Sequence, residues 1–214
     1  LTLFSPEVGD LPTVQAESTL SDPDALLSAL DFNPRTEYRY TDANGAEVIV
    51  EGSRKLRIQS NESILYQGGS SPVLTISAQD GVPTVWEAAA GVYHLLSSRS
   101  PGAGQASLCL TQLRQEGEQT FLEFEYVLNG SLVRFADGQP AASAELTGTI
   151  VNSLSLRFRE YILNAATSPL LPRTQAVAIA QSRQVANLPI AYRDDGSPKI
   201  SASWMAECAR PSPQ

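Results

Sequence analysis

The 214-residue sequence predicts an α+β protein of two similar modules, each a curved antiparallel sheet with a helix packed on one face. Short segments in which apolar and polar residues alternate recur along the chain, and turn dipeptides separate them. Two of these turns, Asn44-Gly45 and Asn129-Gly130, each follow an aromatic strand and precede a valine-bearing strand. This correspondence indicates an internal duplication.

The charge balance argues against two classes of partner. The chain has 15 Lys and Arg residues against 23 Asp and Glu residues, a formal net charge of −8, and no basic stripe. Because proteins bind nucleic acid and anionic lipid surfaces through clustered basic side chains, neither partner is expected.

Residues 1–20 are predicted to be a leader or linker, because prolines, glycines and polar residues occur there without periodicity. The sequence has no initiator Met and no run of the roughly 18 to 20 apolar residues that a membrane helix needs. An extracytoplasmic domain whose N-terminal anchor or signal has been removed would have these features. A trimmed cytosolic protein would look similar.

The first module is predicted to span residues 21–100. Asp22 is a helix N-cap with Pro23 at the first helical position, and Asn33-Pro34 ends that helix. Thr84 and Glu87 have capping-box spacing and begin a second helix that runs to about residue 97. The strands expected between the helices are 38–40, 48–50, 55–58, 64–66 and 73–77.

The second module is predicted to span residues 101–214, with the boundary near a linker-like stretch at 100–105. Its centre is a meander over 121–161, where Asn129-Gly130 supplies the two positive φ angles of a tight hairpin. The remaining expected elements are strands 106–114, 119–128, 132–135, 142–146 and 150–158, a helix over 173–186, and a hairpin of 188–193 with 199–207.

The strand and turn order resembles that of YycH/YycI-type regulatory proteins. In the first module the similar residues are Tyr38-Arg39-Tyr40, Asn44-Gly45 and Ile64-Leu65-Tyr66, and in the second they include Tyr126 to Gly130 and Ser155-Leu156-Arg157. The helix beginning at Gln175 and the pair Ser203-Trp204 are similar to the family's closing helix and strand. PepSY-like modules, which are small units of a helix and a sheet, have a similar order of elements.

This resemblance implies a bitopic protein of a Gram-positive bacterium, with one N-terminal membrane helix and an outer domain. Such a domain modulates a sensor histidine kinase of a two-component system that governs cell-wall metabolism. The expected partner is therefore a membrane protein such as that kinase or a paralogous regulator, and the function is regulation through protein contacts.

Catalytic constellations are not evident in the sequence, and we expect no enzyme activity, cofactor or metal site. His94, the single histidine, lies mid-helix without a flanking motif, so a structural or surface role is expected. Glu123 and Glu125 share one strand face and could act as an acid–base pair, although exposed strand faces are commonly charged. Asp194-Asp195-Gly196 is expected to form a turn and not a calcium site, because the twelve-residue pattern of oxygen ligands that binds calcium is absent.

The two tryptophans and the two cysteines are expected to have structural roles. Trp86 and Trp204 are expected to pack on the core or its rim, with contact to a ligand as the alternative. Cys109 and Cys208 are candidates for a disulfide, which the chain-entropy model credits with about 4 to 5 kcal/mol, and otherwise they are small buried hydrophobes.

Two other functions remain open on the sequence. One is a secreted cell-wall hydrolase that uses a carboxylate pair. The other is a secreted peptidase-inhibitor module that presents the hairpin tip Glu116-Gly117-Glu118.

Overall fold

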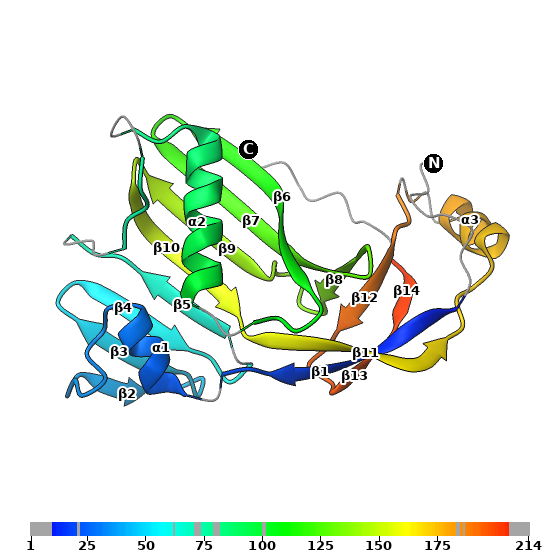
Figure 1. Cartoon of the computed structure of the whole chain (residues 1–214), viewed down its shortest axis with the longest axis horizontal. Coiled ribbons are helices and arrows are strands. Elements are labelled where there is room, and N and C mark those ends of the chain that lie inside the picture. The colour runs from blue at the N-terminus through cyan, green and yellow to red at the C-terminus, as the bar shows by residue number, and fades with distance from the viewer. Residues whose placement is uncertain are drawn as a thin grey trace.

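The computed structural model describes residues 10–20, 22–61, 63–70, 74–78, 82–99, 102–182, 185 and 187–205, except the side chain of residue 99. These residues form two sheets and three helices (Figure 1). The predicted α+β class is therefore confirmed. Of the helices described, none is long and apolar enough to cross a bilayer.

Most strands belong to one 11-stranded sheet, in the order β14-β12-β8-β7-β9-β10-β5-β4-β3-β2, with β6 paired to β7 outside this path. The bounds are β2 Arg39–Thr41, β3 Glu47–Glu51, β4 Arg54–Ile58, β5 Ser63–Gln67, β6 Ser107–Glu116, β7 Gln119–Leu128, β8 Ser131–Phe135, β9 Ala142–Thr147, β10 Ile150–Arg157, β12 Ile190–Asp194 and β14 Ala202–Trp204.

Helices α1 (Pro23–Ala29) and α2 (Val85–Arg99) pack on this sheet over one continuous core (Figure 1). Both predicted N-termini are confirmed. The Asp22 carboxylate accepts hydrogen bonds from the backbone N–H groups of Asp24 and Ala25. Thr84 Oγ1 accepts from the Glu87 N–H at 3.2 Å, while Glu87 Oε2 accepts from the Thr84 N–H at 2.8 Å. These bonds satisfy helix N–H groups that would otherwise lack partners.

The structure does not confirm the division into two modules. β5 pairs with β10 over residues 63–67 and 153–157, so strands of both expected modules belong to one sheet. Apolar residues from both also share one core, for example Leu56 and Val92 with Leu122 and Leu154.

Residues Leu11–Ser18 form strand β1, so the prediction that residues 1–20 are a leader or linker is wrong for this part of the chain. It lies in a second sheet between β11 (Arg159–Ser168) and β13 (Lys199–Ile200), and it is antiparallel to both. Val14 and Ala16 are buried there, whereas Gln15 and Glu17 are exposed. Residues 1–9 lie outside the described part of the chain.

The predicted central meander is wrong in its order. The turn at Asn129-Gly130 is as expected, with φ angles of 49° and 74°. However, β9 pairs with the first half of β7 and not with β8, which pairs with the second half. β8 is instead completed by a parallel partner, β12, because a ten-residue strand has room for two short partners along one edge.

The C-terminal elements differ from the predicted helix and hairpin in detail. Helix α3 (Arg173–Ser182) packs through Ala176 and Ala180 against Leu188, near Trp204. The predicted second strand of the hairpin is divided, with β13 pairing with β1 and β14 with β12. Three predictions extend beyond the described residues. These are the end of that second strand from residue 206, residues 183, 184 and 186 of the predicted helix, and residue 73 of the predicted strand 73–77. The described residues 74–78 form no strand, although Thr75 bridges to Ile150.

Candidate functional site

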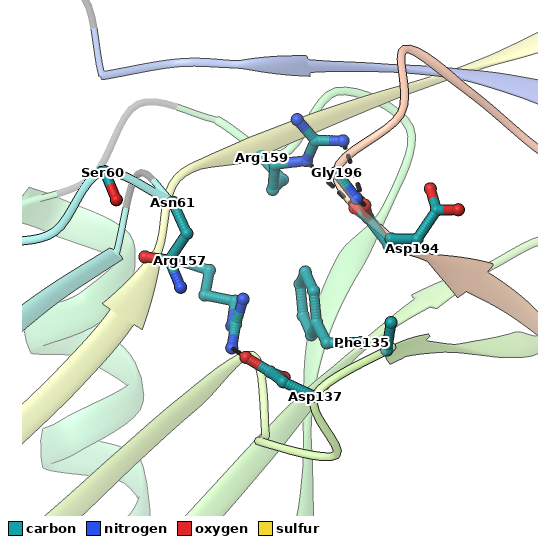
Figure 2. A pocket seen from close by; sticks show the side chains of 10 residues that line it. Ser60, Asn61, Phe135, Asp137, Arg157, Arg159, Asp194 and Gly196 are labelled. Carbon is teal, nitrogen blue, oxygen red and sulfur yellow. Dashed lines mark hydrogen bonds and ion pairs between the residues drawn. The ribbon is translucent and has the colours of Figure 1, made fainter.

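A cavity of about 340 Å³ lies where the two sheets meet, at the turns β4–β5, β8–β9 and β12–β13 and the junction of β10 with β11. We call it the charged cavity. All three turns contribute polar groups, and the β10–β11 junction contributes two arginines. The lining residues are Ser60, Asn61, Phe135, Ala136, Asp137, Arg157, Arg159, Asp194, Asp195 and Gly196 (Figure 2).

One wall of the charged cavity is a buried ion pair. Arg159 donates from Nε and Nη2 to the two carboxylate oxygens of Asp194, at 3.0 and 3.1 Å. Tyr161 donates its hydroxyl to Asp194 Oδ2 at 2.8 Å, and the Gly196 N–H donates to Oδ1 at 2.9 Å. Burial, together with the adjacent carboxylate, raises the pKa of Tyr161, which therefore stays protonated as a donor. This wall is rigid because each charge has several partners.

The opposite wall is a second ion pair that is more exposed. Arg157 lies over the Phe135 ring, 4.3 Å from its centroid, and its Nη2 donates to Asp137 Oδ2. Burial opposes ionisation of Asp137, but hydrogen bonds from Arg157 and from the Gln139 N–H outweigh it and lower the pKa of that carboxyl. Figure 2 shows the two pairs apart, with Arg159 and Asp194 on one side and Arg157 and Asp137 on the other.

The Asp194-Asp195-Gly196 turn closes the charged cavity, in agreement with its prediction as turn chemistry. Asp195 is exposed, and hydrogen bonds from the Ser197 hydroxyl and N–H lower the pKa of its carboxyl. The cavity lining is mostly charged and polar, with two arginines, three aspartates, Ser60 and Asn61. Its chemistry therefore suits the binding of a small polar ligand.

A second surface feature is the exposed face of α2. Trp86, Ala90 and Tyr93 are exposed and lie four and three residues apart, so they form one stripe, which we call the α2 stripe. Trp86 is 75% exposed and Tyr93 is 45% exposed. The prediction that Trp86 packs on the core or its rim is thus wrong, because the helix faces the core with Ala88, Ala89 and Val92 instead. Trp204 does pack on the core rim and donates its indole N–H to the Leu171 carbonyl at 2.8 Å.

The structure disperses the other candidate residues. His94 is exposed on α2 and lines a separate open cavity of about 530 Å³ with Ile76, Glu87 and other residues. Glu123 and Glu125 share a strand face, as predicted. Glu125, however, is only 1% exposed and accepts a hydrogen bond from Arg134 Nη1 at 2.6 Å. Neither glutamate lines the charged cavity or the cavity beside His94.

The cysteines, the hairpin tip at residues 116–118 and the acidic side chains form no further site among the described residues. Cys109 is half-buried in β6, whereas Cys208 lies outside the described residues, so their disulfide stays a prediction. The Glu116-Gly117-Glu118 tip is exposed, and Glu116 pairs with Arg114 at 2.9 Å. Within the described residues, no three His, Cys, Asp or Glu side chains are grouped to hold a metal.

Sequence reasoning missed the charged cavity. One signal was available: Arg157, Arg159 and Tyr161 recur at every second position around the buried Phe158. Charged and aromatic residues with that spacing share one strand face, which is unusual for a segment otherwise rich in apolar residues.

Comparisons with known proteins place the chain by fold alone. No family model matches the sequence, and no curated protein matches it. A solved structure of an uncharacterized protein from Eubacterium rectale is similar, with a TM-score of 0.52 over 95% of this chain and 80% of that one. The sequence identity is 9%, so the similarity concerns the fold.

Proposed function

We propose that this chain is the outer-face part of a membrane-tethered regulator that acts through protein contacts. Its partner would be a membrane protein, such as a sensor histidine kinase or a paralogous regulator. In this proposal, residues 21–100 and 101–214 are related modules whose strands have merged into one sheet. The support comes from the resemblance of the sequence pattern to YycH/YycI-type proteins and from the α2 stripe.

The α2 stripe carries the proposal. A tryptophan that is three-quarters exposed leaves a large apolar surface in water, and such surfaces mark sites of interaction. Trp and Tyr are enriched among the residues that dominate binding energy at interfaces. The stripe also belongs to a 15-residue helix fixed to the core through Val92 and Leu96, so a partner would meet a preformed surface.

The test is capture of partners from native membranes, with a crosslinker, by the wild-type domain and by the double variant Trp86→Ser/Tyr93→Ser. We expect the double variant to capture at least about tenfold less of an envelope protein, as for loss of an aromatic hot spot. Tyr38→Ser is the matched control, because Tyr38 is 74% exposed and directly precedes β2, the strand at one end of the large sheet, and this variant should capture as wild type does. Equal capture by the double variant, or no envelope protein captured by any form, would overturn the proposal.

A further inference from the structure

We propose that the charged cavity binds a small amino-acid-like molecule that carries both an ammonium and a carboxylate group. This inference adds a ligand to the protein contacts of the proposed function and does not depend on them. It follows from the arrangement of charges around the cavity, from the unequal exposure of its two ion pairs, and from its volume.

Arg157 would hold the carboxylate of the ligand. Its guanidinium has one face on the Phe135 ring and is shared with Asp137, whose side chain is 45% exposed on a surface turn. A ligand carboxylate can take the place of the half-exposed Asp137 carboxylate, so that the charge of Arg157, whose side chain is only 13% exposed, stays paired. The planar guanidinium then offers a bidentate geometry, which an ammonium donor would lack.

Asp195 and Asp137 would hold the ammonium. The lining has two arginines and three aspartates, and Arg159 and Asp194 neutralise each other in the buried wall. Arg157 and Asp137 form the second pair, and Asp195 adds one further carboxylate. The pKa values of Asp137 and Asp195 are both lowered, so both carboxylates are ionised at neutral pH. The lining side chains thus carry one more negative than positive charge, although Arg193 beside the cavity also acts on Asp195, and the mixture of both signs suits a ligand that carries both charges better than a simple anion.

The size and rigidity of the charged cavity fit such a ligand. About 340 Å³ is at the lower end of the range for small-molecule sites, roughly 300 to 1,000 Å³. The buried Arg159–Asp194 pair fixes one wall and the turn that carries Asp195, so part of the site is formed before a ligand enters.

The test is a titration of the folded domain with alanine and lysine, followed by amide chemical shifts in NMR at low ionic strength. Acetate and ethylamine each carry one of the two charges and serve as probes for a single-charge site. We expect saturable shifts at the β8–β9 and β12–β13 turns with the amino acids only, at dissociation constants of about 0.1 to 10 mM.

Variants connect the binding to Arg157. Arg157→Gln should weaken amino-acid binding about tenfold or more through loss of the charge-assisted bonds. Arg114→Gln is the matched control, because Arg114 lies 4.4 Å from the Phe121 ring centroid and pairs with Glu116, outside the charged cavity. The control should bind as wild type does.

Three outcomes would overturn the inference. Acetate binding as tightly as alanine would identify an anion site, and ethylamine binding as tightly as lysine would identify a cation site. Saturation by none of the probes would show that the cavity takes no such ligand. Trp86→Ser/Tyr93→Ser should still bind amino acids, so failure of the partner experiment and failure of this one are separate results.

Discussion

At the scale of single residues, the two ion pairs of the charged cavity should differ in their importance for stability. Asp194→Ala leaves the buried Arg159 without its main partner, and we expect a loss of about 3 to 5 kcal/mol in the free energy of unfolding. Asp137→Ala breaks a pair whose carboxylate is 45% exposed and whose guanidinium is 13% exposed, and it should cost less, about 1 kcal/mol. Urea unfolding followed by circular dichroism measures both, and equal losses would contradict this assignment of the two walls.

The Asp137 carboxyl should also make stability depend on pH. Its pKa in the folded state is lowered, so its contribution is complete above the unfolded-state pKa, which is about 3.9. The contribution then decreases as the pH falls through the folded-state value. The difference in unfolding free energy between wild type and Asp137→Asn should therefore be largest near neutral pH and disappear in strong acid. A difference that grows in acid would have the wrong sign.

Local chemistry made several residues of the fold predictable. Asp22, Thr84 and Asn129 were identified from the sequence because caps and tight turns depend on neighbours within four residues. The partners of Arg159 and Arg157 were not, since Asp194 is 35 positions away from Arg159 and Asp137 is 20 away from Arg157. The exposure of Trp86 was also not predictable, because an indole in the first turn of a helix can either cover the end of the core or face solvent.

At the scale of elements, the contact between α2 and residues 74–78 decides whether one substitution in α2 raises or lowers the free energy of unfolding. Gly91 lies mid-helix, where alanine would normally stabilise by about 1 kcal/mol. A Cβ at this position would approach the Cβ of Ile76 to 2.8 Å, so the segment must move. We expect Gly91→Ala to destabilise by about 1 to 3 kcal/mol in thermal or urea unfolding. Stabilisation would show that residues 74–78 are not packed against the helix.

Strand β1 gives a second prediction at this scale. Val14 is fully buried between β11 and β13, and Val14→Ala should cost about 2 kcal/mol in unfolding free energy. The exposed neighbour Gln15→Ala is the control and should be nearly neutral. If residues 11–18 were an unpacked leader, neither substitution would change the unfolding free energy. The strand escaped prediction because its partners lie about 150 and 185 positions later, and Pro12 next to a register shift interrupts its alternation.

At the scale of the whole molecule, the single large sheet predicts one folding unit. Residues 21–100 expressed alone would lack β10, the partner of β5, and strands β6 and β7, which contact α2. We expect this fragment to show a narrow amide spectrum in NMR, typical of an unfolded chain. A well-dispersed spectrum would instead support two independent modules.

The sequence predicted the strands and helices of this molecule better than their arrangement. Hairpins such as β6–β7 and β3–β4 join neighbours in the chain, and their turns carry glycines at positive φ. The parallel pair β8–β12 and the pair β5–β10 join segments about 60 and 90 residues apart. Long-range pairs of this kind leave no periodic signal in either partner, and they are the pairs that bring the walls of the charged cavity together.

The position of β1 also determines how the molecule responds to mechanical force. Hydrogen bonds in antiparallel pairs run perpendicular to the strands, and β1 has such pairs on both edges. A pull along β1 from the segment before Leu11 loads these bonds in shear, all at once, and does not peel them apart one by one. The load then enters β11, whose first residue is Arg159. Tension on the N-terminal side is therefore borne by the same strand that forms the rigid wall of the charged cavity.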